Sequence, residues 1–329
     1  MKKVKRLRLA GAAFTCVSLL ALWGTAAKAQ SVPVNEPNGI NLGGTSFFDG
    51  LGSYKPGFIY EQYFQYFHFN AINGSNGEAS PAFKGTSISS TVSLNQLIYV
   101  SPYHLFGGVL GLTALQPFTD LNASFANDSP AKLEANTGTG VGDLTWGPFL
   151  AFPPIMHNGR PIFAHRFEFD VISPTGSYNP SLDINPSSGY WSIAPYWAMT
   201  VLPTAKTEIS ARFNYLHNFV NNDPASSMPL PLGTTTKAGD AGWVNFTASY
   251  EFFPKFNAGL NGYYFKQFTG NQVDGVTQDG GAVENLSLGA GATYAFDRNN
   301  IGFFNFYLPV KEVNTTSGFH LVLRFVHVF

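Results

Sequence analysis

The chain has 329 residues, with 19 Lys and Arg against 20 Asp and Glu; aromatic residues make up 16% of it and charged residues only 12%. This charged share is about half that of a typical soluble protein. The chain has no basic run beyond its first residues and is moderately acidic without them, which argues against a nucleic-acid-binding protein.

The first residues are typical of an export signal. A positively charged stretch (2–8) precedes an apolar run (9–23), and Ala27-Lys28-Ala29 then supplies the small-x-small pattern read by signal peptidase. We therefore predict a signal peptide, 1–29, cleaved after Ala29. The apolar run is too short to act comfortably as a membrane anchor. Cleavage removes six Lys and Arg and leaves 13 basic against 20 acidic residues. It also removes Cys16, the single cysteine, so the mature chain has no disulfide and no thiolate metal ligand.

The next segment, 30–55, is rich in glycine, weakly charged and without strand periodicity. Beyond residue 29, no apolar stretch reaches the length of about 18 residues that a membrane helix needs. The segment has two possible places: the periplasm, or the lumen of the structure that follows, where it would act as a plug.

From residue 56 onward the sequence alternates between apolar and mostly polar residues. In 244–252, for example, Val244, Phe246 and Ala248 alternate with Asn245 and Thr247. This period of two predicts β-strands with one apolar face. We expect twelve strands, with an uncertainty of two: 57–69, 85–100, 104–116, 142–152, 161–173, 189–202, 206–219, 242–253, 256–268, 284–296, 300–308 and 318–329.

The connections alternate between long and short. The long ones are rich in Gly, Asn, Asp, Ser and Pro, and cover 70–84, 117–141, 174–188, 220–241 and 269–283. The short ones include Pro102-Tyr103, Pro203-Thr204-Ala205, Pro254-Lys255 and Asp297-Arg298-Asn299, with a longer link at 153–160. The connection at 309–317 is shorter than the other long connections. This layout predicts an all-β fold: a closed antiparallel transmembrane β-barrel over 56–329, with short periplasmic turns and long extracellular loops.

A secreted β-sandwich is the alternative fold. The polar faces argue against it, because they carry Ser, Thr, Asn and Gly rather than the Lys and Glu of a solvated surface. The chain also ends on an alternating apolar face closed by Phe329, which resembles the C-terminal signature read by the outer-membrane assembly machinery. His327 departs mildly from that signature. We therefore expect lipid of the bacterial outer membrane and that machinery as partners.

The charged residues inside strands indicate which face points inward. A Lys or Arg facing lipid near the midplane costs about 2–4 kcal/mol, so the charges should face the lumen. They either line a solute path or pair with one another to fill the interior. The candidate lumen-lining residues are Arg166, Glu168, Asp170, Glu208, Arg212, Glu251 and Arg324.

No catalytic, cofactor or metal site is expected. The sequence has no Gly-x-Ser-x-Gly elbow, its histidines have no metal-ligand spacing, and its carboxylates form no calcium-loop pattern. We expect that the protein is not an enzyme.

Several stretches are similar to the outer-membrane β-barrel family named for the MetA pathway of phenol degradation. They are 39–47 (GINLGGTSF), 140–144 (GVGDL), 174–178 (PTGSY) and 262–267 (GYYFKQ). The resemblance implies a transporter-like barrel associated with the degradation of aromatic compounds. It implies no cofactor and no catalytic residue.

The leading hypothesis is an outer-membrane channel for passive uptake of a small hydrophobic or aromatic solute. A barrel of about twelve strands lies between filled eight-stranded and open sixteen-stranded barrels, which favours a narrow, selective path. The first alternative is a closed structural or adhesion barrel that acts through its extracellular loops, above all 220–241. A weaker alternative is a lipid-modifying enzyme.

Overall fold

The computed structural model describes residues 34–329, and all of its regular structure is β. The predicted signal peptide and its cleavage site lie outside the described residues. Within them, no helix has both the length and the hydropathy needed to cross a membrane.

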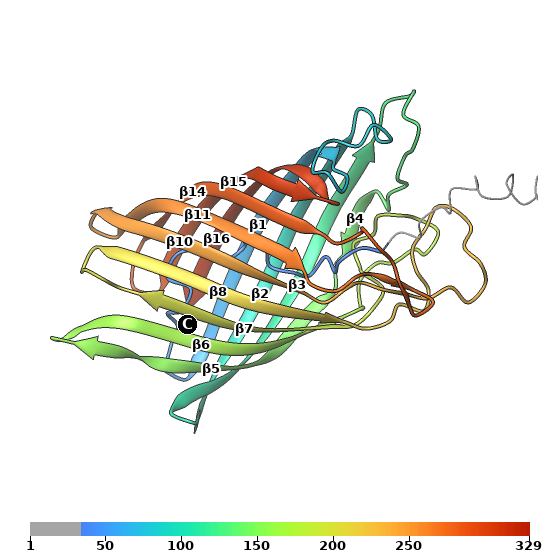
Figure 1. Cartoon of the computed structure of the whole chain (residues 1–329). Helices are drawn as coiled ribbons and strands as arrows, with labels where there is room; N and C mark the ends of the chain where they lie inside the picture. Colours follow the sequence, from blue (N-terminus) through green and yellow to red (C-terminus); the bar gives the residue numbers. More distant parts are fainter. Residues whose placement is uncertain (1–33) are drawn as a thin grey trace, which may run out of the picture. The chain divides into compact units, whose positions relative to one another are not determined.

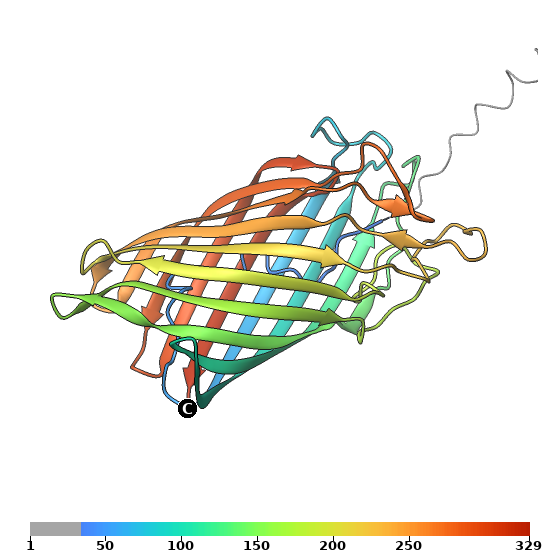
Figure 2. The same cartoon turned by 60° about the horizontal axis from the view of Figure 1, so that its bottom comes forward.

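The main sheet of residues 34–329 contains twelve long antiparallel strands that close on themselves (Figures 1 and 2). β1 pairs with β16 on one side, where Ile59 faces Val328, and with β2 on the other, where Ile59 faces Ile98. The predicted fold class and strand number are therefore confirmed. The strands are β1 (Gly57–Ile72), β2 (Ser87–Leu105), β3 (Gly108–Ser124), β5 (Leu144–His157), β6 (Arg160–Ser173), β7 (Ser192–Val201), β8 (Thr207–Asn218), β10 (Ala241–Phe253), β11 (Phe256–Gln267), β14 (Glu284–Ala295), β15 (Asn300–Val313) and β16 (Thr316–Val328).

Closure is a consequence of backbone chemistry. In hydrocarbon, an unpaired N–H or C=O group costs several kcal/mol, so a sheet that spans a bilayer can have no free edge. The last strand completes the ring: Phe329 donates its backbone N–H to the carbonyl of Phe58 at 3.0 Å.

Four short strands lie among the long loops. β4 (Gly138–Val141) extends the line of β5 along β3, and the remaining three form a small separate sheet. In that sheet β12 (Gln272–Val273) pairs with β13 (Val276–Thr277) and with β9 (Thr236–Lys237). The loops thus have their own hydrogen-bonded structure at one end of the barrel (Figure 1).

The predicted turn at Pro102-Tyr103 is wrong. β2 continues through these residues to Leu105 with a break in register after Val100, and the chain reverses at Phe106-Gly107. Proline has no N–H to donate, and an irregular strand position tolerates it. Phe106 and Gly107 both have positive φ (52° and 84°), as a two-residue hairpin turn requires.

Two other reversals are tighter than expected. The link at 153–160 reduces to Asn158-Gly159, with φ values of 48° and 76°, so β5 and β6 are longer than predicted. Asn-Gly is the strongest short hairpin signal in a sequence. The gap at 309–317 reduces to Asn314-Thr315, because β15 extends to Val313. The end of the barrel with long loops therefore includes one two-residue turn.

Side chains alternate between lipid and lumen along each strand. In β8, Glu208 and Arg212 are buried while Ile209 and Phe213 are 44% and 48% exposed. The same order holds in β6, where Arg166 and Glu168 are buried between outward-facing aromatic residues. The exposed face of the sheet is apolar and aromatic, as contact with lipid requires.

Candidate functional site

The segment that precedes β1 runs through the lumen. Figures 1 and 2 show it (dark blue) inside the ring of strands. We call residues 34–55 the lumen segment. At the loop end, the Asn38 side-chain amide donates to the carbonyl of Asn185 at 2.7 Å, and the Tyr190 hydroxyl donates to the carbonyl of Asn35 at 2.6 Å. Near the other end, Lys55 is two residues before β1.

Aromatic and amide side chains of the wall hold the middle of the lumen segment. Trp243 of β10 donates its indole N–H to the carbonyl of Asn41 at 2.9 Å. Asn245, on the same strand, accepts the Gly43 N–H at 3.1 Å, and the Tyr307 hydroxyl donates to the Gly43 carbonyl at 2.9 Å. Because these bonds satisfy the peptide groups of an irregular segment, the segment can lie where water is scarce.

Gly43 is required by this packing. Its φ is +69°, and a Cβ placed on it would lie 2.8 Å from the ring of Tyr263 and 2.9 Å from that of Tyr307. An L-residue would be strained in both backbone and side chain. The glycine-rich composition of the segment therefore allows the backbone to approach the wall closely.

The next residues dock against buried polar groups of β7 and β8. The Phe48 N–H donates to the carboxylate of Glu208 at 2.9 Å, and the Gly50 N–H donates to the Thr200 hydroxyl at 2.9 Å. Phe47 is fully buried. The segment is thus joined to the wall by hydrogen bonds and by packing of an apolar side chain.

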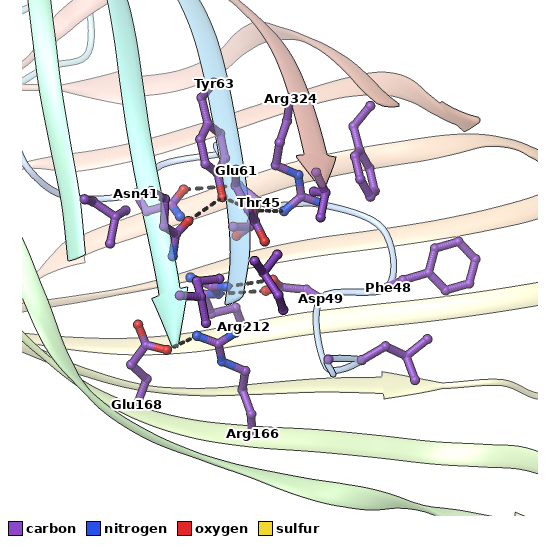
Figure 3. A pocket seen from close by; sticks show the side chains of 18 of the residues that line it. Asn41, Thr45, Phe48, Asp49, Glu61, Tyr63, Arg166, Glu168, Arg212 and Arg324 are labelled. Carbon is purple, nitrogen blue, oxygen red and sulfur yellow. Dashed lines mark hydrogen bonds and ion pairs between the residues drawn. The ribbon is translucent and has the colours of Figure 1, made fainter. Parts of the chain in front are cut away.

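Between these two contacts, Asp49 forms a two-point ion pair with Arg212 (Figure 3). Arg212 Nε and Nη2 each lie 2.7 Å from one carboxylate oxygen. The guanidinium group also lies 4.0 Å from the ring centre of Tyr196. This planar arrangement is the strongest form of charge-assisted hydrogen bond between these groups.

The other two arginines of this region are paired within the wall itself. Arg166 bonds Glu168, two positions along β6. Arg324 of β16 lies 3.7 Å from the carboxylate of Glu61 on β1, too far for a hydrogen bond. The Tyr63 hydroxyl donates to the same carboxylate at 2.7 Å.

A cavity of about 570 Å³ lies between the lumen segment and the wall. Its walls are of two kinds. The charged groups described above line one part, and an apolar part is formed by one buried cluster with its neighbours: Ile59, Ile98, Val100, Phe149, Ala151, Val326 and Val328. The cavity therefore offers both apolar and charged surface to a small molecule.

The seven residues predicted to line the lumen lie in three different places. Five of them border this cavity: Arg166, Glu168, Asp170, Arg212 and Arg324. Glu208 is 1% exposed and accepts hydrogen bonds from the lumen segment and from neighbouring hydroxyls instead. Glu251 is near the turn between β10 and β11, where it accepts the Lys255 N–H at 3.0 Å, and does not border the cavity.

Sequence reasoning missed Asp49, Glu61 and Tyr63. Glu61 carries the signal used for the others, a charge within a strand, but both faces of β1 are rich in aromatic residues and conceal the alternation. Asp49 carries no such signal, since it lies in an irregular segment. Within the described residues, no group of three or more His, Cys, Asp or Glu side chains could hold a metal ion.

The family and its solved relatives agree with this fold. The model of the family described as "Putative MetA-pathway of phenol degradation" matches residues 69–325, and the chain belongs to this family. The predicted resemblance is therefore confirmed. No curated protein matches the chain.

Solved structures of outer-membrane barrels are similar to it. The COG4313 outer membrane channel from Pseudomonas putida F1 has 21% identity and a TM-score of 0.70, over 85% of this chain and 99% of that one. The transport unit of the autotransporter AIDA-I from Escherichia coli has 7% identity and a TM-score of 0.47, over 85% and 92%. A TodX mutant, a monoaromatic hydrocarbon channel, has 9% identity and a TM-score of 0.43, over 84% and 91%. At these identities, the first of them establishes the fold and nothing more.

Proposed function

We propose that this member of the family is an outer-membrane channel for passive uptake of a small hydrophobic or aromatic solute. The observation that carries the proposal is the cavity of about 570 Å³ inside the barrel. Its volume lies within the range of pockets that bind small organic molecules. Its lining combines apolar and aromatic side chains with charged groups of both signs, which suits an organic molecule better than a bare ion.

The apolar part of the cavity supports the proposal that the solute is hydrophobic or aromatic. Phe149 and Ala151 of β5 and Ile98 and Val100 of β2 are at most 3% exposed, yet they border the cavity. In a barrel, inward positions that face water are usually polar. An inward-facing apolar cluster is better matched by an apolar solute, because its burial removes hydrocarbon surface from water on both partners.

The lumen segment is the natural regulator of the path. It contacts β7, β8, β10 and β15 through the hydrogen bonds described above, and it borders the cavity from Gly39 to Ser53. We include in the proposal that the predicted segment 30–55, of which the structure describes 34–55, acts as a plug, and that a solute passes when the plug shifts.

Conductance in a planar bilayer tests the proposal. Two refolded chains are compared, the mature chain (30–329) and a variant that lacks residues 30–55. We expect small, infrequent currents from the first and steady channels from the second. Uptake of a neutral aromatic molecule such as benzyl alcohol into vesicles should follow the same order. Silence from both chains, with no uptake in either, would overturn the channel and favour a closed structural barrel.

A further inference from the structure

The ion pair between Asp49 and Arg212 differs from the other ion pairs around the cavity. Arg166 and Arg324 have acids that belong to the wall, Glu168 and Glu61. The acid that pairs with Arg212 is Asp49, which belongs to the lumen segment and lies 163 residues away in the sequence. When the lumen segment moves, Arg212 loses its acid, whereas Arg166 and Arg324 keep theirs nearby because both partners belong to the closed sheet.

Arg212 forms a built receptor for a carboxylate. Its side chain is 9% exposed, and the guanidinium presents Nε and Nη2 side by side to two oxygens at 2.7 Å each. Tyr196 lies against the face of the guanidinium, 4.0 Å away. Tyr196 thus holds the guanidinium by its face and leaves the Nε–Nη2 edge to a carboxylate, while the apolar part of the cavity suits an aromatic body attached to that carboxylate.

The charges around the cavity indicate that a solute carboxylate replaces Asp49 at Arg212 rather than binding beside it. Among the described wall residues that border its charged part, three arginines (Arg166, Arg212, Arg324) face three acids (Glu61, Glu168, Asp170), and Asp49 adds a fourth acid. Lys255 and Arg298 also border the cavity, but they are exposed at the short-turn rim. A second carboxylate beside Asp49 would raise the excess of acids over arginines in this part from one to two. A carboxylate that replaces Asp49 leaves the balance unchanged.

The backbone beside Asp49 favours its release. Phe48 has a φ of +61°, a left-handed backbone conformation that is strained for a non-glycine residue. The contacts on both sides of it hold this conformation. When the Asp49 carboxylate loses Arg212, one of those contacts is gone and the strain opposes re-docking.

We propose that Arg212 binds the carboxylate of an aromatic acid, and that Asp49 is a built-in competitor which the acid displaces to loosen the lumen segment. The proposal deepens the proposed function, on which its gating step rests, by naming the solute class as organic carboxylates.

Binding of benzoate to the refolded mature chain in detergent, followed by calorimetry, tests the receptor. Benzyl alcohol and benzylamine serve as the neutral and cationic probes of similar size. The variants are Asp49→Asn, which removes the competitor, and Arg212→Met, which removes the receptor. Glu251→Gln is the control for the loss of an acid, because Glu251 accepts the Lys255 N–H at a turn and does not border the cavity.

We expect Asp49→Asn to bind benzoate about tenfold or more tightly than the unmodified chain, because a tethered competitor acts at an effective concentration in the millimolar range. Arg212→Met should lose benzoate binding, and Glu251→Gln should leave it unchanged. Benzyl alcohol should bind all variants equally. Heat-modified mobility in gels checks that each variant is folded.

The inference would be overturned by equal benzoate affinity in Asp49→Asn and the unmodified chain, by equal gains in Asp49→Asn and Glu251→Gln, or by a preference for benzylamine. Asp49→Asn channels that open without any change in benzoate binding would also overturn it, since Asp49 would then be a structural contact of a working channel. If the benzoate effects hold but no chain conducts, the carboxylate site stands and the channel function fails.

Discussion

The carboxylate of Glu208 accepts the backbone N–H of Phe48 at 2.9 Å, so a residue of β8 is bonded to a segment 160 positions earlier in the chain. The same carboxylate accepts the Ser249 hydroxyl at 2.8 Å and the Thr247 hydroxyl at 3.3 Å. Glu208 therefore joins the lumen segment to two neighbouring strands.

Replacing Glu208 by Ala should loosen the lumen segment. The change leaves buried donors without an acceptor, at about 1–3 kcal/mol for each group. Because a difference of 1.4 kcal/mol is tenfold in an equilibrium, we expect the open probability in a planar bilayer to rise about tenfold. Glu251→Ala is the control, since Glu251 accepts only the N–H of a turn residue, Lys255. Equal currents from both variants would contradict the role assigned to Glu208.

Arginine at Phe213 should destabilise the barrel far more than arginine at Ile209. Both side chains point outward from β8, but Ile209 is two residues from the short-turn end of that strand. An arginine on the lipid face costs about 2–4 kcal/mol at the midplane and about 0–1 near the interface. Urea titration in lipid vesicles measures the free energy of unfolding of both arginine variants. Phe213→Leu is the control that loses the ring contact with Trp197, 5.8 Å between ring centres, without adding a charge. Equal costs at both positions would mean that the outward face of β8 does not contact a bilayer.

Replacing Phe329 by Ala should impair assembly in cells but not refolding in detergent. The residue is 72% exposed and its ring lies against that of its neighbour His327, 4.6 Å between ring centres, so it adds little to packing inside the barrel. The backbone N–H bond to Phe58 is independent of the side chain. We expect less heat-modifiable protein in outer membranes and unchanged refolding yield. If assembly in cells and refolding yield in detergent fell by the same factor, the ring would act in folding rather than in recognition by the assembly machinery.

Raising the pH should release the loop end of the lumen segment. Burial raises the pKa of Glu36 to about 8 from an ordinary value of 4.5, with the nearby Asp240 adding to the shift and the hydrogen bond from Asn218 opposing it. Tyr190 is also nearby. The docked state thus binds the proton more tightly than the released state. Docking is therefore strongest below about pH 4.5 and weakens as pH rises toward about 8.

Thiol labelling of Pro37→Cys, at a buried position, reports this release, with Ser75→Cys in an exposed loop as the reference for reagent chemistry. The ratio of the two labelling rates should rise between pH 5 and about 8. Adding Glu36→Gln should flatten that rise, because the group no longer titrates. A rise that survives Glu36→Gln would assign the pH dependence to another group.

The sequence by itself determined the barrel. Alternation with a period of two, apolar residues on one face and charges such as Arg166 and Arg212 on the other are local properties, and a bilayer imposes the same sorting on every strand. The twelve strands and the inward direction of these charges therefore followed without knowledge of any contact. The turns were less accessible: Asn158-Gly159 was readable as a hairpin, whereas Phe106-Gly107 lay beyond a proline pair that appeared to end the strand.

Only the tertiary structure decided which charges meet. Asp49 lies in a segment without periodicity, and its pairing with Arg212 depends on the closure of the barrel and on the path of that segment through the lumen. Glu208 and Arg212 have the same pattern in the sequence, yet one bonds backbone N–H and hydroxyl groups while the other borders the cavity. Strand patterns are fixed by neighbours one or two residues away, but the position of an inserted segment is fixed by many weak contacts with strands that are distant in the chain.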